Sequence, residues 1–437
     1  MPKKKHAKRK AANPDFRART QVPAPPVEAI AQRLRAMLTP AAFAPLRHAP
    51  GTVKRRDRLL TLPVMVAIVV SLVWRQIPSL QELLRVLALE GLLWSEAVSV
   101  SKQALSKRLA TLPASLFAEL FADALQQAPP LAVAEAGALA GVGKRFAALW
   151  LADGSTLEAL RRKLKALREQ PQSPLAGKMM MMVDGLTRRP LQAFYSDQAN
   201  ANDKRFGDQL LAALPAGGLV VMDLGFFSFP LFDKFTAAKK YFVTRQRQKT
   251  AYKTVAVGNE QAHYRDEIIE LGQYRSNPCR HLLRQVSVLW NGQWYRYLTN
   301  VLDDKQLTAR EVCELYRRRW RIEEAFLLTK RLLGLSYLWV GGKNGVEIQV
   351  YATWIFYTVL TEVCVQVGQA LSQPLEQISV EMVFRSLYHY SRALEGDEEV
   401  ELLSFLVTHA KLLGLVKAKR KRHRERASEN FNVWGEP

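Results

Sequence analysis

The chain has 437 residues, of which 48% are hydrophobic and 9% aromatic, so disorder along its whole length is excluded. Its 63 Lys and Arg outnumber 40 Asp and Glu, and the net charge of +23 indicates a polyanionic partner, nucleic acid before an anionic membrane surface. Cys279, Cys313 and Cys364 are too few and too scattered for a disulfide framework, and the seven histidines lack zinc-ligand spacing. We therefore expect a reducing, cytoplasmic setting.

Positive charge is concentrated at both ends of the chain. Residues 1–20 hold eight basic side chains and one acid, and residues 417–426 hold seven and one. Such segments cannot fold alone and suit salt-sensitive contacts with phosphates; the alternative is a role in solubility only. No targeting signal is expected, because no apolar stretch follows the basic Met1–Lys10 segment.

The most apolar stretch, Leu59–Trp74, is 16 residues long and contains a proline. It is shorter than the roughly 20 residues that a membrane span needs, so we predict a buried helix and no membrane partner. Residues 11–30 before it are a proline-rich linker, and the region from 30 to 127 has a helical pattern. Within it, Ser101–Leu109 is typical either of a small DNA-reading helix or of an ordinary surface helix.

Beyond an Ala/Pro-rich joint the pattern changes to short apolar strands. Three of them, which we expect to form an antiparallel meander, are predicted at 146–152, 178–183 and 191–195. A helix and two more strands are predicted at 204–214, 218–222 and 240–244.

A different texture begins at residue 245. Alternating segments with a hairpin turn at Asn291-Gly292 predict a β-rich insertion, separate from the first sheet, at 252–257, 264–270 and 281–290. A capping box, Thr308-x-x-Glu311, then opens one long helix to about Leu333. Further helices are predicted at 346–367 and 399–416.

Two aspartates, Asp153 and Asp223, each follow a short apolar strand. Each alone is more typical of a turn, but an acid on a later helix could complete a set of metal ligands, because Mg²⁺ prefers carboxylate oxygens. Two such ions, about 3.5–4 Å apart, can activate water and stabilise the leaving oxygen of a phosphodiester. Bound metal would also offset the repulsion between clustered acids and a polyanion.

The segment Tyr316–Lys330 carries the third acid. In a continuous helix Tyr316, Glu323 and Lys330, spaced by seven, share one stripe, and Arg319 and Trp320 flank it one turn before Glu323. The stripe offers a carboxylate for metal and basic groups for phosphates. The alternative is a solvated, charge-rich helix face.

These residues resemble a known family. Tyr316-x2-Arg319-x3-Glu323-x6-Lys330 matches the Tyr-Arg-Glu-Lys signature of bacterial insertion-sequence transposases of insertion-sequence family four. Segments 152–155 and 222–228 are similar to the first and second aspartate motifs of that group. The resemblance covers about residues 146–345. It implies a DDE transposase with an α/β, ribonuclease-H-like catalytic core, interrupted by a β-strand insertion between the second aspartate and the glutamate.

The resemblance also implies roles for individual residues. Asp153, Asp223 and Glu323 would be the catalytic, metal-binding triad for two Mg²⁺ ions, with Mn²⁺ as a substitute. The groups expected to contact DNA are Tyr316, Arg319, Trp320 and Lys330, with Arg245 and Arg247 extending that surface and Trp294 or Tyr295 stacking on a flipped base. For Trp294 and Tyr295 the alternative is a core or cross-strand aromatic. Other acids compete for the triad roles: Glu324, Asp184, Asp197 and Asp203.

The implied function is cut-and-paste transposition of double-stranded DNA by a homodimer, with a hairpin intermediate. Two alternatives remain: a metal-dependent nuclease of the same fold that does not join strands, and an inactive DNA-binding descendant. The expected organisation is a basic disordered tail and linker, a helical DNA-binding domain, the core in two parts around the β insertion, and C-terminal helices with a basic tail. The boundaries are 1–29, 30–140, 141–244, 245–300, 301–370 and 371–437.

Overall fold

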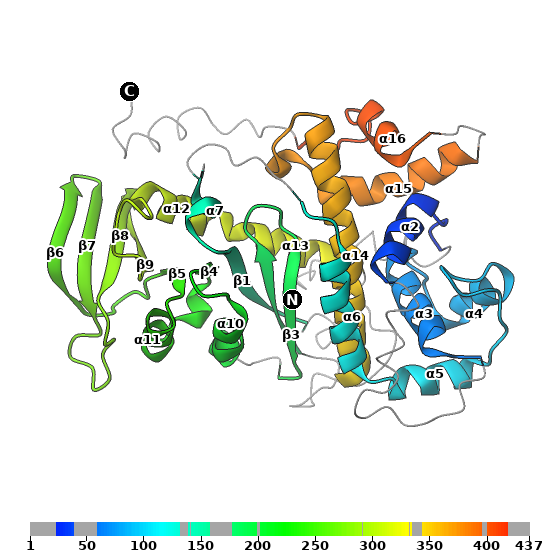
Figure 1. Cartoon of the computed structure of the whole chain (residues 1–437), viewed down its shortest axis with the longest axis horizontal. Coiled ribbons are helices and arrows are strands. Elements are labelled where there is room, and N and C mark those ends of the chain that lie inside the picture. The colour runs from blue at the N-terminus through cyan, green and yellow to red at the C-terminus, as the bar shows by residue number, and fades with distance from the viewer. Residues whose placement is uncertain are drawn as a thin grey trace, which may run out of the picture.

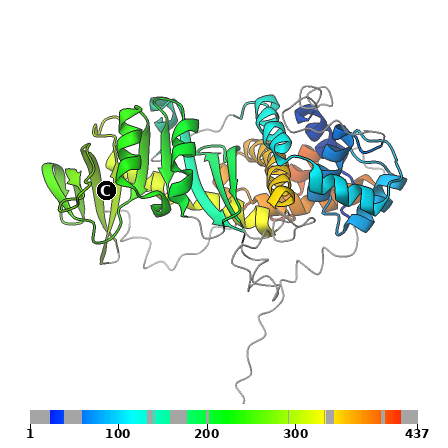
Figure 2. The same cartoon turned by 90° about the horizontal axis from the view of Figure 1, so that it is seen from below.

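The computed structural model describes residues 23–38, 59–131, 139, 141–157, 177–198, 202–290, 292–331, 333, 343–395 and 400–417. The basic segment 1–20 lies outside these residues, as does the C-terminal basic segment after Lys417. Two parts lie side by side along the long axis of the molecule: a sheet with helices, and a body made of helices (Figures 1 and 2).

The helical body combines segments from both ends of the chain. Its elements are α2 (Glu28–Met37), α3 (Leu62–Trp74), α4 (Leu80–Leu89), α5 (Lys102–Thr111), α6 (Ala114–Gln127), α14 (Lys343–Ala370), the short 3-10 helix η6 (Leu375–Gln377), α15 (Val380–Leu394) and α16 (Leu402–Thr408). Helix α14 contacts most of the others, including α3, α6, α15 and α16. The predicted helix at 399–416 is shorter than expected, because the chain turns after Thr408 and Val416 bridges to Ile378.

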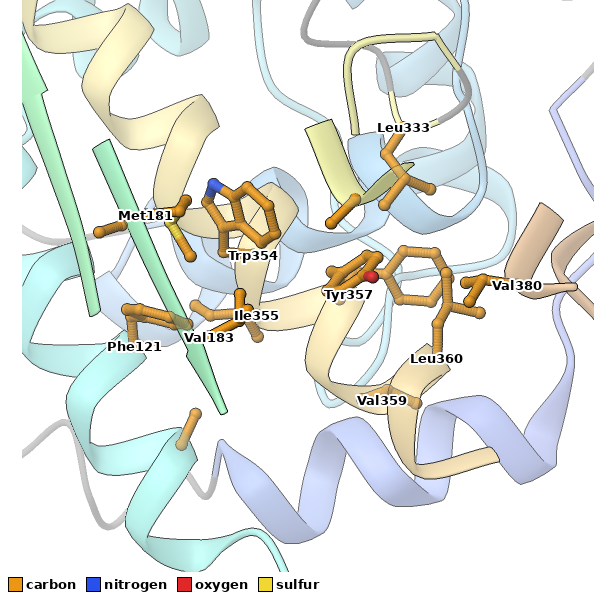
Figure 3. Packing of buried hydrophobic residues seen from close by; sticks show 14 of the residues in the cluster. Phe121, Met181, Val183, Leu333, Trp354, Ile355, Tyr357, Val359, Leu360 and Val380 are labelled. Atoms are coloured by element: carbon orange, nitrogen blue, oxygen red, sulfur yellow. The ribbon is translucent and has the colours of Figure 1, made fainter. Parts of the chain in front are cut away.

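Apolar helices explain how this body is held together. The predicted buried helix is α3, whose residues from Met65 to Trp74 are all buried. Within the described residues, α14 is the one helix long and apolar enough to cross a membrane, and its most apolar window is buried inside the protein. Trp354 and Ile355 of α14 lie beside Met181 and Val183 of the sheet and Phe121 of α6, which joins the two parts of the molecule (Figure 3).

The strands of the described residues form one nine-stranded sheet in the order β3-β2-β1-β4-β5-β9-β8-β7-β6. Their bounds are β1 (Leu149–Thr156), β2 (Lys178–Asp184), β3 (Pro190–Ser196), β4 (Leu219–Met222), β5 (Tyr241–Arg245), β6 (Tyr252–Gln261), β7 (Tyr264–Leu271), β8 (Leu283–Trp290) and β9 (Gln293–Thr299). Strands β1, β2 and β3 form the predicted antiparallel meander, and β1, β4 and β5 are parallel neighbours.

The expectation that the β-rich insertion is separate from the first sheet is wrong. Strand β9 pairs antiparallel with β5, with Val243 opposite Thr299 and Arg245 opposite Tyr297, so β6–β9 continue the same sheet. The unpaired edge of β5 gives the physical reason, because its buried N–H and C=O groups need partners. Gly292, in the predicted hairpin turn, has a φ of 70°, whereas Asn291 lies outside the described residues.

Helices cover both faces of the sheet. One face packs against α10 (Gly207–Ala213), α11 (Phe229–Ala237) and the 3-10 helices η4 (Asp203–Phe206) and η5 (Leu224–Phe226). The other packs against α12 (Ala309–Arg318), α13 (Trp320–Arg331) and α14, and the short α7 (Val142–Arg145) precedes β1. Side chains alternate along a strand. Met180 and Met182 therefore pack in the core on the α10 face, and Met179 and Met181 pack in the core on the α13 face. This alternation accounts for the continuous apolar run in β2.

The predicted long helix after Thr308 is interrupted. The capping box is present, with Glu311 N donating to the Thr308 hydroxyl and Thr308 N donating to the Glu311 carboxylate. However, α12 ends at Arg318 and α13 begins at Trp320. Around the junction Arg319 N donates to Tyr316 O and Ile322 N donates to Arg319 O, which are bonds to the third preceding residue and make a tighter turn. The break therefore falls at the arginine of the signature.

Candidate active site

The three predicted acids lie around one guanidinium group. Asp153 is in β1, Asp223 follows β4, and Glu323 is in α13. The strand predicted at 146–152 instead spans Leu149–Thr156, so Asp153 lies inside it and does not follow it. Strands β1 and β4 are parallel, with Ala152 opposite Met222, so Asp153 lies level with Asp223 at the end of β4. Arg319 lies 2.5 Å from Asp153, 3.4 Å from Asp223 and 3.2 Å from Glu323. Three elements that are distant in the sequence thus supply carboxylates to one point.

The three carboxylates differ in how deeply they are buried. Asp153 is only 6% exposed, and this burial raises its pKa to about 7, an effect that the charge of Arg319 opposes and that of Asp223 reinforces. The side chains of Asp223 and Glu323 are 32% and 42% exposed, so they can reach solvent and ligands. Burial lowers the pKa of Arg319, but the facing acids outweigh it and the pKa is raised overall. The guanidinium is therefore fully charged.

The backbone fixes both aspartates. Gly154 N donates to Asp153 Oδ1 at 2.8 Å, and Gly225 N donates to Asp223 Oδ2 at 3.4 Å. In each motif a glycine that follows the acid therefore holds one carboxylate oxygen and leaves the other to face Arg319.

The donor chemistry of the three acids fits a hard divalent cation, because they offer only carboxylate oxygens. Two of the three carboxylates are partly open to solvent. One oxygen from each of the three acids lies within 3.4 Å of the Arg319 guanidinium. No set of three or more His, Cys, Asp or Glu side chains among the described residues is already arranged as a metal cage. The guanidinium of Arg319 lies among the oxygens instead, so a bound cation would compete with it.

The other residues of the signature surround this group. Tyr316 is buried, its ring packs 5.1 Å from the ring of Tyr297, and Arg319 stacks over it at 5.6 Å. Trp320 is 60% exposed and also lies 5.6 Å from the Arg319 guanidinium. Burial lowers the pKa of Lys330 to about 8, and its ammonium donates to Ser155 and to Thr156 O.

The two aromatic residues predicted as base platforms differ in placement. Tyr295 is opposite Val288 and Trp294 is opposite Leu289, so their side chains leave opposite faces of β9. Tyr295 stacks with Arg245 at 5.1 Å on the face that also bears Tyr297, next to Tyr316. Trp294 stacks with Arg265 at 5.8 Å on the other face.

Arg247 contacts an aromatic ring of the second aspartate motif. It is exposed and stacks over Phe227, 5.7 Å away, beside the core of the α10 face. The structure thus brings Tyr295 and Arg245 to the Tyr316 side of the sheet, and does not bring Trp294 and Arg247 there.

The competing acids have other partners. Glu324 pairs with Lys417 at 3.1 Å and with Arg188 at 3.8 Å, and Asp197 pairs with Lys343. Asp184 accepts hydrogen bonds from Leu186 N and Thr187 N, so it stabilises the turn between β2 and β3.

Asp203 is different, because it lies directly against the glycines of both aspartate motifs. Sequence reasoning named it only as a competitor. A glycine soon after the aspartate of each motif is the one sequence signal of a close approach there.

The region that contains these residues is similar to known proteins. Residues 153–359, a range that begins at the first acid, match the family model described as transposase DDE domain. A protein of Sinorhizobium fredii named as a transposase is 27% identical over 37% of this chain and 46% of its own length. One from Synechocystis, named as the transposase for insertion sequence element IS4SA, is 23% identical over 44% of this chain and 56% of its own.

The match thus spans about half the length of these curated relatives. A solved structure titled as a piggyBac transposase synaptic complex with hairpin DNA aligns over 94% of this chain and 88% of its own, with a TM-score of 0.40 and 11% identity. The stretch of the chain that carries the signature and the three acids is therefore similar to the transposase DDE domain and to transposases of insertion sequences.

Proposed function

We propose that this protein is a cut-and-paste DNA transposase that binds inverted-repeat ends, cleaves them and joins their 3′ ends to target DNA. The observation that carries the proposal is the meeting of Asp153, Asp223 and Glu323 at Arg319. A buried aspartate beside two accessible acids, on a chain of net charge +23, suits a site that handles a polyanion with the help of a cation.

The catalytic core is proposed to be ribonuclease-H-like. Three antiparallel strands followed by two parallel strands, in the order β3-β2-β1-β4-β5 with helices on both faces, support this assignment. Its two parts would be 141–244 and 301–370, and 245–300 would be an insertion that extends the same sheet. Residues 30–140 are the proposed DNA-binding domain, and 371–437 the C-terminal helical region and basic tail.

Asp153, Asp223 and Glu323 are the proposed ligands of Mg²⁺, with two ions in the active complex. Bound metal would activate the attacking oxygen and stabilise the leaving oxygen of a phosphodiester. The chain's own groups hold and orient the reactants. Gly154 and Gly225 fix two of the carboxylates through their N–H groups, and Arg319, once released from the acids, can donate two hydrogen bonds to a phosphate.

DNA would approach the α13 face. Trp320 is exposed there, Lys330 presents an ammonium group, and Tyr316 backs the Arg319 guanidinium. Tyr295, stacked with Arg245 on the same side, is the better-placed platform for a base moved out of the stack in a hairpin intermediate. Two transposon ends imply a homodimer, and the setting would be the bacterial cytoplasm.

Isosteric substitutions test the proposal. Asp153→Asn, Asp223→Asn and Glu323→Gln should each lower Mg²⁺-dependent cleavage of end DNA by about 10³-fold or more, since each removes part of a metal contribution of several kcal/mol. End binding in Ca²⁺ should survive. Glu324→Gln is the matched control, because its carboxylate pairs with Arg188 and Lys417 away from the site. Normal cleavage by any one of the three variants would remove that residue from the triad.

A second assay separates the proposed function from that of a nuclease of the same fold. Precut end DNA with a free 3′-OH is supplied together with a target plasmid. A transposase joins the two, and a nuclease without strand transfer leaves them separate.

A further inference from the structure

Two glycines that adjoin the catalytic aspartates face one carboxylate. Gly154 follows Asp153, and Gly225 lies two residues after Asp223. A Cβ atom at residue 154 would lie 2.0 Å from Asp203 Oδ1, and one at residue 225 would lie 2.1 Å from Asp203 Oδ2. The carboxylate of Asp203 therefore fills the space that a side chain at either position would need, and it lies between β1 and the turn that follows β4.

Asp203 reaches these glycines from the face opposite Arg319. Leu151 belongs to the core on the α13 side of β1 and Ala152 to the core on the α10 side, so by alternation Asp153 faces α13 and Gly154 faces α10. Asp203 opens η4, whose Phe206 is part of the α10-side core. Its side chain is 13% exposed and pairs at 2.6 Å with Lys178, which is 11% exposed. This side of the strand ends is closely packed.

The two glycines connect the faces. Gly154 and Gly225 each donate a backbone hydrogen bond to the carboxylate of their own motif aspartate. Asp203 bears on the Cα side of both glycines. A shift of either glycine would move the attached carboxylate relative to its neighbour, and packed interiors transmit such shifts rather than absorbing them.

We infer that Asp203 is a positioning residue, which sets the separation of the Asp153 and Asp223 carboxylates through the two motif glycines and so determines their joint affinity for a divalent cation. The inference rests on the proposed function, because it takes these two aspartates as metal ligands. Asp203 acts through the glycines and not as a ligand, and Lys178 neutralises its charge in the packed interior.

Titration of the full-length, DNA-free protein with Mn²⁺ tests this inference. Asp203→Ala removes the wedge and should weaken Mn²⁺ binding by about 10- to 100-fold, as the loss of a group that orients metal ligands usually does. The paired change Asp203→Asn with Lys178→Met keeps the shape and removes both charges, so it should bind within about threefold of wild type. Asp208→Ala is the matched control, since Asp208 is 76% exposed and pairs with Lys234.

The same variants have a kinetic signature. In Asp203→Ala the Mg²⁺ concentration for half-maximal cleavage should rise by a similar factor, whereas the rate at saturating Mg²⁺ should recover substantially. A residue that only stabilises the fold would lower the unfolding midpoint without this shift in metal dependence. The inference is overturned if Asp203→Ala binds Mn²⁺ as tightly as wild type, or if the shape-preserving pair loses as much affinity as Asp203→Ala.

A double-mutant cycle tests the contact itself. Gly154→Ala places a methyl group against the Asp203 carboxylate, so it should lower the thermal unfolding midpoint more in the wild-type background than in Asp203→Ala, where space is available. Equal effects in both backgrounds would show that Asp203 does not bear on Gly154. Failure of the proposed function has a different signature: Asp153→Asn and Asp223→Asn would then also bind Mn²⁺ like wild type.

Discussion

The two faces of the sheet differ in the contacts that they make around the two motif aspartates. On the α13 face, Arg319 is shared among three carboxylates, two of which are partly open to solvent. On the α10 face, Asp203 is wedged against Gly154 and Gly225 and paired with a nearly buried lysine. One face therefore holds charges that can change partners, and the other holds atoms that have no room to move.

This difference has a physical basis. Ion pairs with solvent-exposed members contribute little net stability, because water and other ions replace the partner at small cost. Close-packed atoms resist displacement, because any shift creates overlap or a void. The proposed site must exchange a guanidinium for metal and phosphate while it keeps its ligands at a fixed separation. Exchangeable ion pairs on the α13 face allow the exchange, and close packing on the α10 face holds the separation.

The largest effect on this difference between the faces is expected from removing the charge of Arg319, which the three acids share. Arg319→Gln should raise the Mn²⁺ affinity of the DNA-free protein by about tenfold, since a charge-assisted hydrogen bond to the acids contributes about 1.5–3 kcal/mol, part of which solvent already offsets here. Affinity for end DNA should fall in the same variant, because a bidentate phosphate donor is lost. Calorimetric titration measures the first effect and fluorescence anisotropy the second.

Arg317→Gln is the control for a general loss of positive charge on the same helices. Arg317 pairs with Glu314 and not with the triad, so this variant should leave Mn²⁺ affinity unchanged. If Arg319→Gln instead weakens Mn²⁺ binding, then Arg319 supports the arrangement of the acids and does not compete with a cation for them.

The sequence predicts the α13 face better than the α10 face. Asp153 lies in the apolar strand β1 and Asp223 directly follows the apolar strand β4, and the segment from Tyr316 to Glu323 is helical on both sides of the break at Arg319. These are local patterns, and the match of residues 153–359 to the transposase DDE domain agrees with the family they indicate. The roles of the individual site residues stay predictions.

What the sequence does not predict depends on contacts between distant segments. Strand β9 pairs with β5 although the paired residues are more than fifty positions apart in the sequence. No local pattern in 252–299 indicates this pairing. The tighter turn occurs at the residue that contacts the three acids, and helix periodicity does not predict a break there. The contact of Asp203 with two glycines exists only after η4 packs behind the strand ends.

The aromatic residues of β9 sharpen the comparison between the faces. Tyr295→Ala should reduce hairpin formation at the transposon end by about fivefold or more, since stacking of one base on an aromatic ring contributes about 1–3 kcal/mol. Trp294→Ala is the matched control on the opposite face, where its ring stacks with Arg265. Hairpin yield on a denaturing gel measures both. A loss with Trp294→Ala alone would place the DNA on the α10 face.

The smallest expected effect is a pH dependence that separates binding from stability. The pKa of Lys330 is lowered by burial to about 8, so its ammonium group loses its proton as the pH rises through 8, and attraction for a phosphate is lost with it. Affinity for end DNA should fall between pH 7 and 9 by about two- to fivefold more in wild type than in Lys330→Arg, which stays charged.

Stability should change in the opposite direction. Between pH 8 and 10.5 the unfolded chain keeps the Lys330 proton that the folded chain has released, so this residue's contribution to the free energy of unfolding rises with pH. Chemical denaturation of wild type and Lys330→Arg across this range, alongside the binding series, measures both slopes. Parallel slopes for the two proteins in both series would mean that Lys330 keeps its ordinary pKa, and that its contacts with Ser155 and Thr156 do not hold it in a desolvated position.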